Sequence, residues 1–268
     1  MPSFTALTPI LWGEIQQAGH SWILLSIRIG IPLSMIPIFG ASYIPRSIRL
    51  LFIATIALAI SWGNRAHIGH INNNVWQSAF TEVALGSVLG LSILIAFAFI
   101  SLAGRLIDTM IGFGMAQVID PVTKRQIPIV NSILDLVATF VFLLLDGHHA
   151  LLRVILYSIE KFPIGQPWPM NATIEIVIIQ LTNQTIFGFM LVAPIVATVL
   201  LVEAALGTIA RSLPQINMLI IGIPIKITAG LLVLGLVAYS MAPSLQRIYN
   251  EINRGWGLLL FQNNVGPT

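Results

Sequence analysis

Cysteine is absent from the 268 residues of the chain, which excludes disulfide bonds, thiolate metal sites and catalysis by a thiol. Charge is also scarce, because Asp, Glu, Lys and Arg together make up 9% of the sequence, whereas a soluble globular protein carries roughly 25%. The net charge of +3 is too small and too scattered to indicate a nucleic-acid partner. No basic segment followed by an apolar core stands at the start, so we expect no cleaved secretory signal.

The sequence motifs of common enzymes are missing as well. There is no glycine-rich phosphate loop, no GxSxG nucleophile turn and no HExxH helix. His148 and His149 follow Asp146 closely, but adjacent side chains on a helix point about 100° apart and do not converge on one ion without a loop. His67 and His70 are better spaced, yet no carboxylate or thiolate accompanies them. We therefore expect no catalytic residues, no cofactor and no metal site, and the protein is not expected to be an enzyme.

Apolar residues dominate what is present. They make up 56% of the chain, and the mean hydropathy is +0.90. The alternation of apolar and polar residues typical of a transmembrane β-barrel is missing, and a helix satisfies its own backbone hydrogen bonds in lipid. The sequence thus predicts an all-α, multi-pass integral membrane protein that forms a single domain over residues 1–268. It has about six hydrophobic segments, at residues 22–39, 50–62, 83–103, 127–145, 187–206 and 218–241.

Several of these segments are poor membrane spans on their own. Segment 22–39 is interrupted by an arginine and two prolines, and segment 50–62 is shorter than the roughly 20 residues that a helical span needs. Segment 83–103 carries no charge and is the best span in the protein. Its Gly86 and Gly90 have the small-xxx-small spacing that lets two helices approach closely, so we expect a packing face there.

Ionisable residues lie in or beside the apolar segments, namely Asp108, Asp135, Glu203, Arg211 and Lys226. An ionised side chain at the bilayer centre costs about 2.5–3.5 kcal/mol on insertion scales, so each needs a partner, a wet cavity or another subunit. Two interpretations are open for the three carboxylates. Either they form a proton relay, as such groups do in pumps, or they pair with cations and fix helix packing. We favour pairing, for which the candidate cations are Arg28, Arg105, Arg211 and Lys226.

A short polar elbow joins the last two apolar segments, Phe187–Leu206 and Met218–Met241. The elbow carries four polar or helix-breaking residues, namely Arg211, Pro214, Gln215 and Asn217. None of these residues is expected to be catalytic.

The segment from Gly112 to Ile119 is apolar and broken by glycine. A catalytic loop would need a nucleophile or a base. This segment instead has soft, deformable and apolar residues, namely Gly112, Phe113, Gly114, Met115, Val118 and Ile119. Such a segment suits a constriction that closes a channel by excluding water, and methionine adds conformational adaptability. The alternative is a re-entrant turn packed inside the helix bundle.

Three stretches together carry a resemblance to a known family. They are Gly112–Pro121 (GFGMAQVIDP), Leu145–Leu151 (LDGHHAL), and residues 193–226 (APIVATVLLVEAALGTIARSLPQINMLIIGIPIK). The order and spacing of these three stretches resemble those of the FliR/SctT family of type III export-apparatus membrane proteins. This family includes a flagellar branch and a virulence branch. The resemblance runs over nearly the full length.

The resemblance implies a subunit of a multi-subunit export gate built from broken helical hairpins. The implied partners are P- and Q-type export-gate membrane proteins and a B-type switch protein. The gate would pass unfolded flagellar export substrates across the inner membrane at the flagellar basal body. By position, Gly112–Ile119 corresponds to the family's plug loop. Five residues correspond to a hairpin that packs against partner subunits, namely Glu203, Arg211, Gln215, Asn217 and Lys226.

Two other functions are compatible with the sequence. One is the T component of a virulence injectisome, which has the same fold and a different cargo. The other is a secondary transporter for a small solute, because broken helices and charges at mid-membrane depth also occur in that class.

Overall fold

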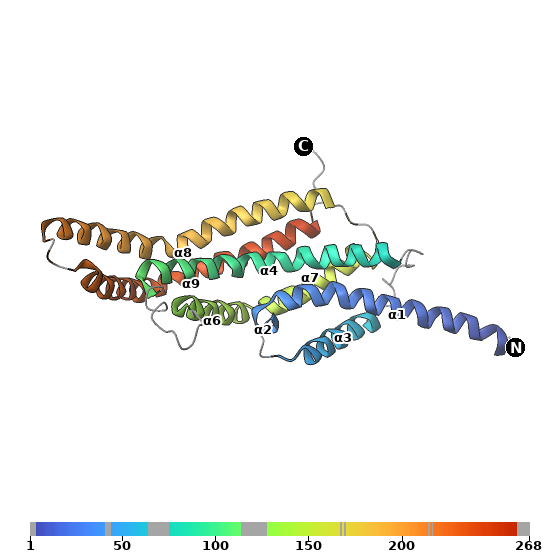
Figure 1. The fold of residues 1–268 in the computed structure, drawn as a ribbon. Helices are drawn as coiled ribbons and strands as arrows, with labels where there is room; N and C mark the ends of the chain where they lie inside the picture. The colour runs from blue at the N-terminus through green and yellow to red at the C-terminus, as the bar shows by residue number, and fades with distance from the viewer. Residues whose placement is uncertain are drawn as a thin grey trace, which may run out of the picture. The chain divides into compact units, whose positions relative to one another are not determined.

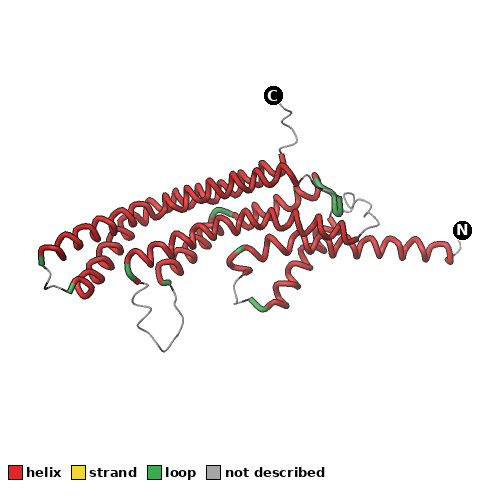
Figure 2. The backbone as a smooth tube through the Cα atoms, turned by 45° about the horizontal axis from the view of Figure 1, so that its top comes forward, coloured by secondary structure: helices red, strands yellow, loops and turns green. Residues whose placement is uncertain are grey.

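The computed structural model describes residues 4–40, 44–63, 75–113, 128–166, 168, 170–213, 215 and 217–261. Within these ranges the chain is helical and contains no strand, which confirms the predicted all-α class (Figures 1 and 2). The helices are α1 (Phe4–Met35), α2 (Pro37–Gly40), α3 (Arg46–Gly63), α4 (Val75–Ile111), α6 (Ile129–Leu144), α7 (Gly147–Lys161), α8 (Met170–Ser212) and α9 (Met218–Phe261).

Four of the helices in the described ranges are long and apolar enough to cross a membrane, namely α3, α4, α8 and α9. A fifth span results if the bent pair α6 and α7 is counted as one. The sequence predicts about six segments, and the number differs mainly at segment 22–39. There α1 ends at Met35 and α2 begins at Pro37, because a proline disfavours the helical conformation of the residue before it.

The helices group into two compact units, each made of segments that are distant in the sequence. Unit 1 consists of Met1–Leu94, Asp146–Ile179 and Asn253–Thr268, and unit 2 of Ile95–Leu145 and Gln180–Ile252. Helices α4, α8 and α9 each contribute one part to unit 1 and another to unit 2. The single domain over the whole chain stays a prediction.

In unit 1, α1 packs closely against the first half of α4 through glycines. A methyl group added at Gly86 would lie 3.1 Å from the carbonyl oxygen of Arg28, and one added at Gly90 would lie 2.9 Å from Cα of Pro32. Both helices therefore approach at backbone distance, which confirms the packing face predicted from the glycine spacing. On its other side α1 contacts α3, where Trp22 Nε1 donates a hydrogen bond of 3.0 Å to the carbonyl oxygen of Ala54.

An aromatic cluster forms part of the core of unit 2. The rings of Phe97, Phe142 and Tyr249 lie with their centroids 5.6–6.0 Å apart, in the tilted and edge-on arrangements that aromatic pairs prefer. The hydroxyl of Tyr249 is buried and donates a hydrogen bond of 2.6 Å to the carbonyl oxygen of Ala138. This contact satisfies the polar end of the tyrosine and joins α9 to α6.

In unit 2 the later part of α8 and the first part of α9 run side by side as a hairpin (Figures 1 and 2). Much of the apolar surface of this hairpin is uncovered, since Leu201 is 72% exposed, Leu236 80% and Tyr239 93%. Such a surface needs lipid or another polypeptide to cover it.

Candidate functional site

The predicted gate segment begins where α4 ends. Gly112 follows the last residue of α4 and has φ +98°, a backbone conformation that glycine adopts without strain. Phe113 is half-buried. The other predicted gate residues, Gly114, Met115, Val118 and Ile119, lie outside the described residues, so the plug stays a prediction.

Asp108 is buried, with 3% of its surface exposed, and it caps the N-terminus of α6. Its Oδ1 accepts a hydrogen bond of 3.0 Å from the backbone N–H of Val130, and its Oδ2 accepts one of 2.9 Å from that of Asn131. The first N–H groups of a helix have no partner within the helix and carry partial positive charge. The carboxylate is therefore stabilised without a cation. Among the described residues no ion pair joins Asp108 to the candidate cation Arg105, because the carboxylate turns inward to α6 while Arg105 is exposed.

Asp135 lies one turn beyond this cap in a small polar network. Asn131 Nδ2 donates a hydrogen bond of 3.1 Å to Asp135 Oδ2, as their spacing of four residues on one helix face allows. Ser101 of α4 donates to Asn131 Oδ1 at 3.0 Å and to Asp135 Oδ2 at 3.3 Å. Asp135 thus has neutral hydrogen-bond donors, and among the described residues it forms no ion pair with the predicted cations.

Glu203 and Lys226 form an ion pair across the α8–α9 hairpin. Lys226 Nζ donates to Glu203 Oε1, which confirms Lys226 as a cation partner. The side chains are 27% exposed for Lys226 and 40% for Glu203. They border a cavity of about 340 Å³ whose other walls include Gly207 and Gly222. The otherwise apolar hairpin therefore contains an ion pair and, beside it, a cavity.

The elbow residues that the structure describes face outward. Arg211, Gln215 and Asn217 are all exposed, and Pro214 lies outside the described residues. In the described part of the hairpin, the pairing predicted for Glu203 is made by Lys226 and not by Arg211.

The most deeply buried ion pair of the described residues, between Arg28 and Glu82, was missed by the sequence reasoning. Their residues are 1% and 0% exposed, and Arg28 Nε and Nη2 donate to the two carboxylate oxygens of Glu82 at 2.5 and 2.8 Å. A signal was present, since a lone arginine in segment 22–39 requires an anion. Glu82 stands directly before segment 83–103, where it looked like an ordinary flanking charge.

Further hydrogen bonds extend this pair into the rest of unit 1. Arg28 Nη1 donates to the carbonyl oxygens of Ser158 and Phe162 at 3.2 and 2.9 Å. Glu82 Oε1 also accepts a hydrogen bond of 2.8 Å from the N–H of Gly165, in the turn after α7. The network therefore joins α1, α4 and α7, and it acts as a structural clamp.

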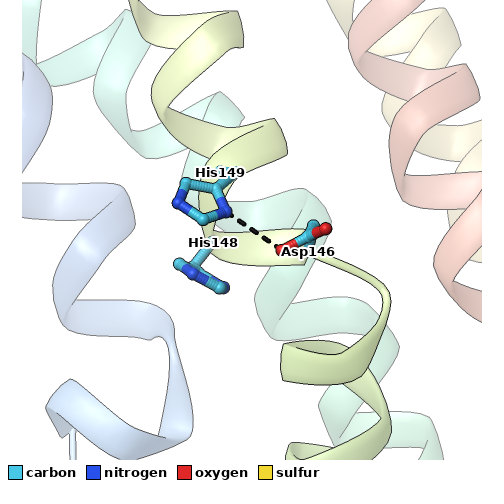
Figure 3. Close-up of side chains that lie close together, drawn as sticks. All are labelled: Asp146, His148 and His149. Carbon is cyan, nitrogen blue, oxygen red and sulfur yellow. Dashed lines mark hydrogen bonds and ion pairs between the residues drawn. The ribbon is translucent and has the colours of Figure 1, made fainter.

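Another cluster lies at the start of α7, where Asp146, His148 and His149 come together (Figure 3). Asp146 precedes the helix with a left-handed backbone, φ +54°. Its Oδ1 lies 3.0 Å from His149 Nδ1, and the two imidazole rings have centroids 4.1 Å apart. The expectation that the two side chains point apart is wrong here, because the rings of His148 and His149 lie close together in the first turn of α7.

Comparison with known proteins decides the family. The model of the family described as "Bacterial export proteins, family 1" matches residues 20–252. The chain belongs to this family. The match covers every cluster described above and confirms the resemblance found in the sequence.

Two relatives of this chain show the same relationship in more detail. The flagellar biosynthetic protein FliR of Bacillus subtilis (strain 168) is 32% identical over 218 residues, which is 80% of this chain and 84% of the relative. The flagellar biosynthetic protein FliR of Escherichia coli (strain K12) is 27% identical over 237 residues, or 87% of this chain and 89% of the relative.

Proposed function

We propose that the protein is a multi-pass, non-enzymatic subunit of the flagellar type III export gate in the bacterial inner membrane. The observation that carries this proposal is the family match over residues 20–252 together with similarity to flagellar FliR proteins over most of the chain. The apolar helices support a place in the membrane. In this role the protein forms, with P- and Q-type subunits, a channel for unfolded flagellar proteins, and a B-type switch protein acts with it.

The α8–α9 hairpin is the surface that we propose for the P- and Q-type partners. Its exposed apolar side chains need lipid or protein to shield them from water. Contact of the half-exposed pair Glu203–Lys226 with lipid is unfavourable, because ionised groups cost free energy in the bilayer. A partner helix that covers the hairpin supplies packing for the leucines and hydrogen bonds for the charged pair. The glycine-walled cavity beside Lys226 has room for a partner side chain.

Deletion of the gene tests the export function. We expect the deletion strain to secrete no flagellin and to assemble no hook or filament, and expression of the chain from a plasmid to restore both. Normal flagellin secretion by the deletion strain would refute the proposal. If secretion of virulence effectors is lost while flagellin export is normal, the injectisome function replaces the flagellar one.

Co-expression with the P- and Q-type genes tests the partner surface. We expect the three proteins to co-purify, and native mass measurement to give one assembly. Lys226→Met leaves Glu203 without its cation and should weaken this assembly, whereas the double change Lys226→Met with Glu203→Gln should restore it. A wild-type chain that stays monomeric beside these partners and moves a small solute into liposomes would instead identify a transporter.

A further inference from the structure

Three potential metal ligands gather within four residues at the start of α7. Asp146, His148 and His149 offer one carboxylate oxygen and two imidazole nitrogens, and these atoms all lie within 4.8 Å of one another. Figure 3 shows the two imidazole rings close together, tilted to each other, with the carboxylate beside them. The family assignment does not explain why two histidine rings should face each other next to an acid.

The spacing of these atoms is close to that of a zinc site. Zn²⁺ binds imidazole nitrogen and carboxylate oxygen at about 2.0–2.2 Å, and tetrahedral geometry then places neighbouring ligand atoms about 3.3 Å apart. His149 Nδ1 and Asp146 Oδ1 already lie 3.0 Å apart. The ligand atom that His148 offers lies within 4.8 Å of both.

His148 provides a second, independent observation. Its Nδ1 is buried and has no hydrogen-bond partner among the described residues. A buried polar atom without a partner costs about 1–3 kcal/mol, and a bound ligand would remove this cost. A bound cation would satisfy this nitrogen.

The backbone conformation of Asp146 also brings its carboxylate close to the histidines. Asp146 holds the left-handed conformation, which is unfavourable for a residue with a side chain, and its side chain makes no capping hydrogen bond to the helix. The carboxylate instead points to His149. Asp146 and His149 are 71% and 57% exposed, so a metal ion has an open path to the cluster.

We propose that Asp146, His148 and His149 form a binding site for a divalent transition metal ion of the Zn²⁺ class. Two imidazoles and one carboxylate are the ligand set that zinc accepts with a water molecule in the fourth position. The ion binds the N-terminal turn of α7 to Asp146 and thereby holds the left-handed break before this helix. Its role is structural, and it goes beyond the export function proposed above.

Metal titration of the purified full chain tests this site. Protein in detergent is stripped with EDTA and titrated with ZnCl₂ by calorimetry, with metal analysis after gel filtration. We expect saturable binding that includes one Zn²⁺ per chain at this cluster. His148→Gln and His149→Gln should each weaken it at least about ten-fold, since even loss of a residue that only supports a ligand costs about 10–100-fold. His20→Gln, at an exposed histidine of α1, is the matched control and should leave this binding unchanged.

A further variant separates metal binding from folding. Asp146→Gly removes the carboxylate but suits the left-handed backbone better than aspartate, so the chain should fold at least as well and still bind Zn²⁺ more weakly. X-ray absorption of the zinc-loaded wild-type protein should show two imidazoles at about 2.0–2.1 Å. Absence of saturable binding, unchanged affinity in the double variant His148→Gln with His149→Gln, or a zinc spectrum without imidazole scattering would each overturn the proposal.

Discussion

Replacing Glu82 by leucine removes the anion from the most buried charged network of unit 1. Arg28 then keeps its charge at 1% exposure with only the carbonyl oxygens of Ser158 and Phe162 as acceptors, and the N–H of Gly165 loses its partner. Removing one member of a buried ion pair typically costs about 3–5 kcal/mol. A loss of this size is a large part of the roughly 5–15 kcal/mol by which folded domains are stable.

The loss can be measured by unfolding the purified chain in detergent with increasing SDS and following its helicity by circular dichroism. Glu82→Leu should lower the free energy of unfolding by about 3–5 kcal/mol. Glu82→Gln should lower it less, because an amide oxygen still accepts a hydrogen bond from Gly165. The matched control is Glu160→Gln, since Glu160 is exposed on α7 and should change stability by less than about 0.5 kcal/mol.

A double-mutant cycle shows whether the two charges act on each other. Arg28→Leu combined with Glu82→Leu leaves no unpaired charge in the core, and apolar replacement of a whole buried pair is often close to neutral. The double variant should therefore lose less stability than the sum of the single variants, with a coupling energy of about 0.5–3 kcal/mol. If Glu82→Leu is as stable as the Glu160→Gln control, the buried pair does not stabilise unit 1 and the reasoning is refuted.

Three further changes have expected outcomes of their own. Asp108→Ala removes both hydrogen bonds to the start of α6 and should reduce stability by at least about 1.5–3 kcal/mol, the value of one hydrogen bond to a charged group; the same SDS titration measures it, and an unchanged midpoint argues against the cap. Gly90→Ala places a methyl group 2.9 Å from Cα of Pro32 and should destabilise the α1–α4 packing by about 1–3 kcal/mol. The matched change Gly19→Ala meets no atom within 4 Å and should be neutral or stabilising because alanine is the better helix former; equal effects of the two changes would contradict close packing at Gly90. Replacing Phe113 and Met115 by glycine should make the assembled gate leak small ions, and membrane conductance equal to that of the wild-type gate argues against a plug at this segment.

The sequence by itself determined the helical membrane class, the family and several features that depend on local spacing. Scarce charge and long apolar runs leave helices as the structure that satisfies the backbone in lipid. Asn131 and Asp135 meet because residues four apart share one face of a helix. Gly86 and Gly90 mark a packing face for the same reason. Lys226 could be named as a candidate cation for Glu203 because the two lie on either side of a short elbow.

Only the tertiary structure decided which helix faces pack together and which partner each charged group binds. Arg28 and Glu82 are 54 residues apart, and nothing in their spacing distinguishes Glu82 from an ordinary charge at the end of a span. Asp108 had a plausible cation three residues away, yet it binds the N–H groups of a helix that lies 22 residues further along the chain. The carboxylate of Asp146 contacts His149 from a left-handed residue directly before α7. Periodicity specifies the face of a helix to which a side chain belongs, whereas its partner depends on how the helices pack against one another.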